Sequence, residues 1–196
     1  MNLIERAKNI LFTPKTEWEV VNGETATPVS ILTGYVLPMS IISCLGTIIS
    51  GFLFTGVYSM SYTISIAAVM LVVSIVTYYL SVIIVDMLAP SFNSEKNSGK
   101  SAQLVAYSNT PGYIAGFLSF IPVIGWILPF VAWAYGIYLM YLGLGPIKKT
   151  PEDKKVVYIL VIYVIMIAIY FILTAILMAI VVAAVVGTGR LGVRNY

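Results

Sequence analysis

Long stretches without charge alternate with short polar stretches along this chain, and the pattern predicts helices that cross a membrane. The uncharged runs at residues 31–54 and 156–186 each exceed the roughly 20 residues needed to cross about 30 Å of hydrocarbon. No part of the chain shows the ~10-residue segments of alternating polar and apolar residues that are typical of membrane barrel strands. We therefore predict an all-α fold, a polytopic membrane helix bundle.

Turn signals divide the apolar part of the chain into five predicted transmembrane helices. Thr27 and Pro28 are typical of a helix start, Pro111 predicts a kink in the third helix, and acidic residues after Pro151 begin the fifth. The fifth helix is longer than one bilayer requires, so we expect it to tilt or to project from the membrane. The predicted spans are residues 28–54, 62–88, 102–120, 123–144 and 152–186, within a membrane domain of residues 28–187.

Residues 1–27 form the only sizeable polar segment before the first predicted span. Its apolar residues recur at helical spacing over residues 3–12, which predicts an amphipathic helix lying in the headgroup region. Thr16 and Glu19 match a capping box for a second short helix. Trp18 on that helix is predicted to anchor the segment at the membrane interface.

Composition agrees with a membrane protein and argues against several function classes. Hydrophobic residues make up 60% of the chain and charged residues 10%, against about half and a quarter in soluble domains. A net charge of +3 is too small to indicate nucleic-acid binding. The chain has no histidine and a single cysteine, Cys44, so we expect no disulfide within the chain, no metal site, no cofactor and no enzymatic activity.

The distribution of charge predicts the orientation in the membrane. With five spans, two basic residues, Arg190 and Arg194, lie on one side of the membrane and the other nine lie on the opposite side. By the positive-inside rule, the side with nine basic residues is cytoplasmic. We therefore expect a cytoplasmic N-terminus, an extracytoplasmic tail at residues 188–196, and location in a bacterial cytoplasmic membrane. The nine are Arg6, Lys8, Lys15, Lys96, Lys100, Lys148, Lys149, Lys154 and Lys155.

Apart from Glu152 and Asp153 in the first turn of the fifth helix, Asp86 is the one acidic residue that belongs to a predicted span. A carboxylate at membrane depth is costly, so we expect it to be paired or to reach a wet cavity. Two interpretations remain open: an interfacial acid that stabilises a helix end, or part of a polar functional site. The predicted polar site consists of Asp86, Tyr107, Ser108, Asn109 and Pro111, and Lys148 and Lys149 are further candidate partners.

Small and basic residues suggest two further roles. Glycines spaced for close helix contact are predicted packing positions, and the lysines around the start of the fifth span are predicted to attract lipid headgroups or an acidic partner. The packing positions are Gly112, Gly116, Gly136 and Gly143, and the lysines are Lys148, Lys149, Lys154 and Lys155.

Three stretches together resemble the Yip (Ypt/Rab-GTPase-interacting protein) domain family in its short bacterial form. They are residues 9–18 (NILFTPKTEW), residues 86–90 (DMLAP) with residues 104–111 (LVAYSNTP), and residues 135–144 (YGIYLMYLGL) followed by a basic turn. The resemblance implies five spans. It also implies a role in membrane organisation, because eukaryotic members act in vesicle traffic through Rab GTPases and through one another.

Two functional hypotheses follow. The first is a non-enzymatic scaffold of the Yip type, whose partners are membrane lipids, other membrane proteins or further copies of itself. Rab GTPases are not expected among them, because this sequence does not carry the long cytosolic N-terminal region of the eukaryotic members. The second is a small transporter or channel for a solute or an ion that uses Asp86 and Asn109.

Overall fold

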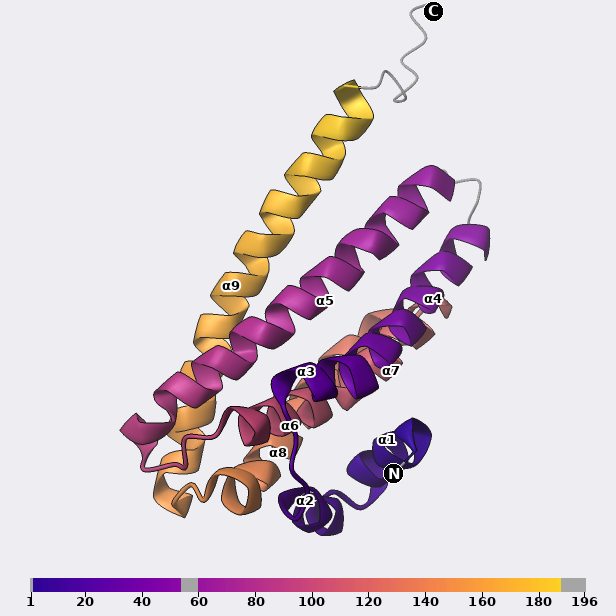
Figure 1. Ribbon diagram of the computed structural model, residues 1–196. Helices are drawn as coiled ribbons and strands as arrows, with labels where there is room; N and C mark the ends of the chain where they lie inside the picture. The colour runs from indigo at the N-terminus through magenta and orange to yellow at the C-terminus, as the bar shows by residue number, and fades with distance from the viewer. Residues whose placement is uncertain (1, 54–59, 188–196) are drawn as a thin grey trace, which may run out of the picture.

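The computed structural model describes residues 2–53 and 60–187, and these residues form helices and short connections without a strand. Predicted features at residue 54 and in the tail at residues 188–196 lie outside this range. Figure 1 shows the long helices side by side, with the two N-terminal helices folded against one end. The helices are α1 (Leu3–Phe12), α2 (Pro14–Asn22), α3 (Pro28–Ile31), η1 (Leu32–Val36), α4 (Leu37–Leu53), α5 (Met60–Leu88), η2 (Ala89–Phe92), α6 (Ser98–Ser108), α7 (Thr110–Phe117), η3 (Leu118–Phe120), α8 (Ile124–Lys148) and α9 (Glu152–Gly187).

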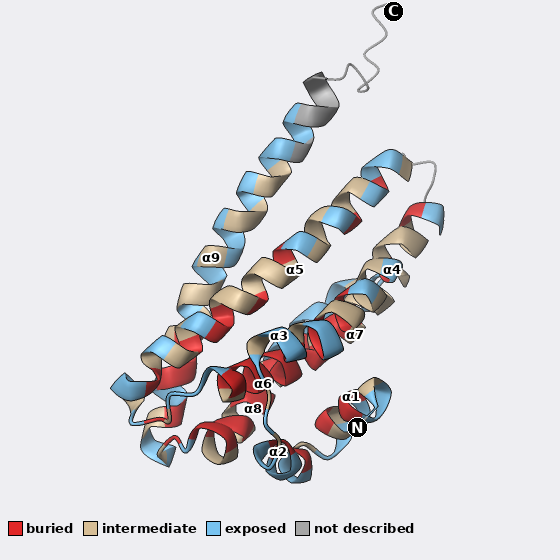
Figure 2. Ribbon diagram, in the orientation of Figure 1, coloured by how far each residue is buried: buried red, intermediate tan, exposed pale blue. Residues whose placement is uncertain are grey.

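Within the described residues, four helical segments are long and apolar enough to cross a membrane. They correspond to the first, second, fourth and fifth predicted spans. Many apolar side chains on them are exposed, especially on the outer part of α9 (Figure 2), as expected for surfaces that face lipid rather than water. The four segments are Pro28–Leu53, Met60–Phe92, Ile124–Lys148 and Glu152–Ile180.

The predicted third span differs from a single helix. It is divided into α6 and α7 at Asn109, whose backbone (φ −86°, ψ 1°) leaves the helical range. Pro111 lies in the first turn of α7 and has no N–H for the helical ladder, which favours a new helix start at this point. Almost every residue of α6 is buried, so its polar side chains face other helices rather than lipid. These polar side chains make the segment less apolar than the other predicted spans.

α6 and α7 pack antiparallel to α8 through close approaches at glycines. A Cβ on Gly143 would lie 2.6 Å from Leu104 of α6, and a Cβ on Gly136 would lie 3.0 Å from the carbonyl oxygen of Ser108. At the other end, a Cβ on Gly125 would lie 2.5 Å from the carbonyl oxygen of Ser119. The divided segment therefore accompanies α8 along most of its length.

Other predicted packing glycines also lie at helix contacts. A Cβ on Gly116 would collide with the side chain of Ser43 on α4, and Gly46 of α4 faces the backbone around Phe117. Gly112 instead faces the side chain of its neighbour Asn109. Glycine lets the backbones of two helices approach closely, and the resulting dispersion contacts favour packing. Such contacts matter in a membrane, where the hydrophobic effect does not drive helices together.

The N-terminal segment is folded onto the bundle, and two predictions for it are wrong. Trp18 is fully buried and its ring lies against Gly143, so it does not anchor the chain at the membrane interface. α2 begins at Pro14 with Thr13 as its N-cap, not at Thr16, because proline at the first position needs no hydrogen-bond partner. α1 has the predicted bounds, and its Ile10 side packs into the protein core.

Candidate functional site

Asp86, at the end of α5, lies in a cluster of hydrogen-bond donors from three other segments. Its Oδ1 accepts from the backbone N–H of Asn97 (2.8 Å), the hydroxyl of Ser101 (2.9 Å) and the ammonium of Lys148 (3.2 Å). Lys148 is 0% exposed and also donates to the Ser101 hydroxyl at 2.7 Å. We call Asp86, Asn97, Ser101 and Lys148 the Asp86 cluster. It compensates a buried ammonium and joins α5, α6 and α8 at one end of the bundle.

The polar connection before α6 is attached to the same end. The backbone N–H of Glu95 donates to the carbonyl oxygen of Lys148 at 2.7 Å, and the hydroxyls of Ser94 and Thr150 lie 2.8 Å apart. Lys149, whose side chain is 74% exposed, pairs with Glu95 at 2.7 Å. This hydrogen bond holds the pKa of the Glu95 carboxyl below its usual range. The loop and the turn between α8 and α9 thus form one connected polar surface.

The predicted polar site is not a single site. Asp86 contacts Ser101, whereas Asn109 is eight residues further along the helical segment, about 12 Å at 1.5 Å per residue. Tyr107 lies elsewhere again, in edge contact with Tyr35 (centroids 4.8 Å apart) and beneath the guanidinium of Arg6 (5.2 Å). Asp86 and Asn109 therefore do not form one contiguous polar site, and their joint action on a solute stays a prediction.

The predicted lipid-binding lysines also divide into two classes. Lys148 and Lys155 are buried, so neither is available to a headgroup. Lys155 pairs with Glu152 at 2.5 Å and lies 5.3 Å from the ring centroid of Tyr141. Lys149 is exposed and Lys154 is partly exposed, so only these two of the four can meet a partner.

A second ionic cluster, which the sequence did not reveal, holds the N-terminal helices in place. Arg6 is 4% exposed and donates to Glu17 at 2.5 Å and to Glu24. The ammonium of Lys100 donates to the carbonyl oxygens of Val21 (3.3 Å), Asn22 (2.6 Å) and Glu24 (3.0 Å), at the C-terminal end of α2. Lysine favourably pairs with the free carbonyls at a helix end, but no local sequence pattern indicates a partner more than 70 residues away.

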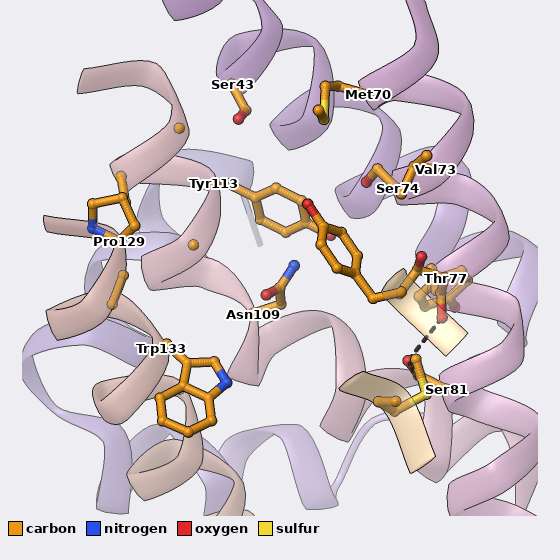
Figure 3. A pocket seen from close by; sticks show the side chains of 18 of the residues that line it. Ser43, Met70, Val73, Ser74, Thr77, Ser81, Asn109, Tyr113, Pro129 and Trp133 are labelled. Atoms are coloured by element: carbon orange, nitrogen blue, oxygen red, sulfur yellow. Dashed lines mark hydrogen bonds between the residues drawn. The ribbon is translucent and has the colours of Figure 1, made fainter. Parts of the chain in front are cut away.

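Ser108 and Asn109 belong to a cavity of about 650 Å³ between the long helices (Figure 3). Asn109 is exposed within the bundle, and the Tyr113 hydroxyl interacts with Asn109, Ser74 and Ser40. Pro111 is buried beside it and positions the start of α7. Among the described residues, no group of histidine, cysteine, aspartate or glutamate side chains could hold a metal ion.

Comparison with known proteins identifies one family. A family model described as the Yip1 domain matches residues 8–176, which is most of the chain. No curated protein and no solved structure matches the chain.

Proposed function

The chain belongs to the Yip1 domain family, and on that basis we propose that it is a non-enzymatic membrane scaffold that works by binding membrane components. Its partners would be lipids, other membrane proteins or further copies of itself. Exposed lysines on a preformed polar surface support this proposal best. Lys8, Lys15, Lys96 and Lys149 are all exposed, and they lie on α1, on α2, in the connection before α6 and in the turn between α8 and α9.

The polar surface is held in shape by buried contacts, which is what a docking surface requires. The Arg6 and Lys100 contacts attach the N-terminal helices, and the Asp86 cluster attaches the neighbouring loop. A surface fixed in advance loses little conformational entropy when a partner binds. The buried ions supply the rigidity, and the exposed lysines supply the attraction.

We propose five membrane crossings, with α6 and α7 together as the third. The support is the antiparallel contact with α8, from Gly143 near Leu104 to Gly125 near Ser119. A segment that accompanies a membrane-spanning helix over most of its length lies at the same depth in the bilayer. Five crossings place the N-terminus in the cytoplasm of a bacterial cell and the C-terminal tail outside, in agreement with the positive-inside rule.

The experiment is to neutralise the four exposed lysines together. Each contributes about 1 kcal/mol of attraction to an anionic membrane surface, so a variant with all four replaced by glutamine should retain much less phosphatidylglycerol and fewer membrane proteins after purification. The matched control replaces the same four lysines with arginine, which keeps the charge. Equal retention by the glutamine and arginine variants would refute the docking role.

A transport assay separates this proposal from the transporter hypothesis. Purified protein in liposomes should pass neither ions nor small solutes above the rate of empty liposomes. Asp86 belongs to an ion pair rather than to the lining of the cavity, so Asp86→Asn should not alter any flux. Reproducible flux that Asp86→Asn abolishes while the variant remains folded by far-UV circular dichroism would contradict the scaffold proposal.

A further inference from the structure

The cavity between the long helices has the size of a small-molecule site. Its volume of about 650 Å³ falls within the roughly 300–1,000 Å³ of known ligand pockets. It is lined by α4, α5, α6, α7, α8 and α9, and four of these helices belong to the segments apolar enough to cross a membrane. An occupant would therefore enter from, or be exchanged with, the bilayer.

One side of the cavity is polar, and two of the hydroxyl groups on that side lack hydrogen-bond partners. The hydroxyls of Ser108 and Thr77 are buried and have no hydrogen-bond partner among the described residues. Asn109 projects toward the cavity in Figure 3, with Ser74 and Tyr113 nearby. At membrane depth there is no bulk water to satisfy such groups, and an unpaired buried hydroxyl is costly. Ser108 and Thr77 would gain a hydrogen-bond partner if an occupant brought a polar atom within reach of their hydroxyls.

The opposite side is apolar. α8 and α9 contribute a wall of aromatic, methionine and aliphatic side chains, namely Trp133, Met140, Ile162, Met166 and Phe171. None of the described lining residues is charged. A phosphate or ammonium placed there would be desolvated without a counterion, which is strongly unfavourable. The lining therefore selects a neutral molecule with one polar and one apolar end.

We propose that this cavity binds a neutral glycerolipid, such as a monoacylglycerol. Its hydroxyl and ester groups would bond to Ser108, Thr77 and Asn109, and its acyl chain would pack against α8 and α9. This site is separate from the exposed lysines and does not depend on the scaffold role.

Cys44 provides the test, because it is the only cysteine in the chain and it lines the cavity. The rate at which N-ethylmaleimide modifies Cys44 is measured by intact mass spectrometry on the purified full-length protein in a mild detergent. Added 1-monooleoylglycerol should slow the reaction several-fold and saturably. Lysophosphatidylglycerol with the same acyl chain should give no protection, because its phosphate is charged.

Two sets of variants identify the site of protection. Ala132→Leu places a larger side chain in the cavity and should remove the protection of Cys44 by monooleoylglycerol. Ala134→Leu, on the exposed side of the same helix, should leave this protection unchanged. Ser108→Ala with Thr77→Val should weaken the apparent affinity roughly tenfold, as expected for the loss of one or two neutral hydrogen bonds. The double variant should still fold, since the hydroxyls it removes have no protein partner.

Three results would overturn the proposal. They are absence of protection by monooleoylglycerol, equal protection by the two lipids, and unchanged affinity in the Ser108→Ala, Thr77→Val variant. Far-UV circular dichroism and the unfolding temperature of each variant show whether a loss of protection reflects a loss of fold. If Ala132→Leu does not fold, the hydroxyl variant alone decides.

Discussion

The Asp86 cluster makes a quantitative prediction about stability, because Lys148 is completely buried while its neighbour Lys149 is exposed. Lys148 is 0% exposed, and the carboxylate of Asp86 is its only ionic partner among the described residues. Asp86→Asn keeps the shape of the side chain but leaves the ammonium with only neutral acceptors: the new amide oxygen, the Ser101 hydroxyl and the Asn97 carbonyl oxygen. Removal of one partner of a buried ion pair costs about 3–5 kcal/mol, and we expect a loss of that size.

Lys148→Met removes the opposite partner and should cost less. Asp86 is 14% exposed and keeps two donors, the Asn97 N–H and the Ser101 hydroxyl. We expect a loss of about 1–3 kcal/mol, typical of an incompletely satisfied polar group. The double variant Asp86→Asn, Lys148→Met contains no unpaired ion, so it should be more stable than Asp86→Asn alone.

The measurement is reversible unfolding of the purified protein in mixed micelles, followed by far-UV circular dichroism. The matched control is Lys149→Met, which breaks the exposed pair with Glu95 and should change the free energy of unfolding by no more than about 1 kcal/mol. A double variant whose loss equals the sum of the two single losses would refute a direct interaction between Asp86 and Lys148. Equal losses for Lys148→Met and Lys149→Met would refute the burial argument.

Three further predictions concern the N-terminal helices and the topology. Trp18→Ala should lower the free energy of unfolding by about 3–5 kcal/mol, because the ring is fully buried. The control Trp126→Ala, at a residue that is 82% exposed, should have little effect. Equal losses in the two variants would contradict this packing. Arg6→Met leaves two carboxylates without their cation and should speed proteolysis between α1 and α3 in intact vesicles; unchanged protection would show that other contacts hold the segment. With Cys44 replaced by alanine, cysteines at positions 96 and 192 should react from the cytoplasmic and the external side respectively; labelling from the same side would exclude five crossings.

The sequence alone was sufficient for the four long apolar helices and for α1, because their determinants are local. Uncharged runs of span length predicted four of the apolar segments with bounds close to those observed, for example residues 28–54 against Pro28–Leu53. The amphipathic pattern at residues 3–12 coincides with α1, and Pro111 marked the division between α6 and α7. Hydrophobic length, proline and capping residues act within one or two helical turns, so each can be interpreted without knowledge of the partner helix.

Only the tertiary structure determines which polar groups contact one another, and composition does not determine these contacts. Lys148 and Lys149 are adjacent and chemically identical, yet one is fully buried against Asp86 and the other faces solvent. Trp18 and Arg6 lie in a polar segment that predicted an interfacial position, but both are buried. The outcome depends on the rotation and register of helices distant in sequence, because consecutive side chains of a helix point about 100° apart. Periodicity records the environment of each helix separately, whereas contacts such as Lys100 with the end of α2 arise only when the helices pack together.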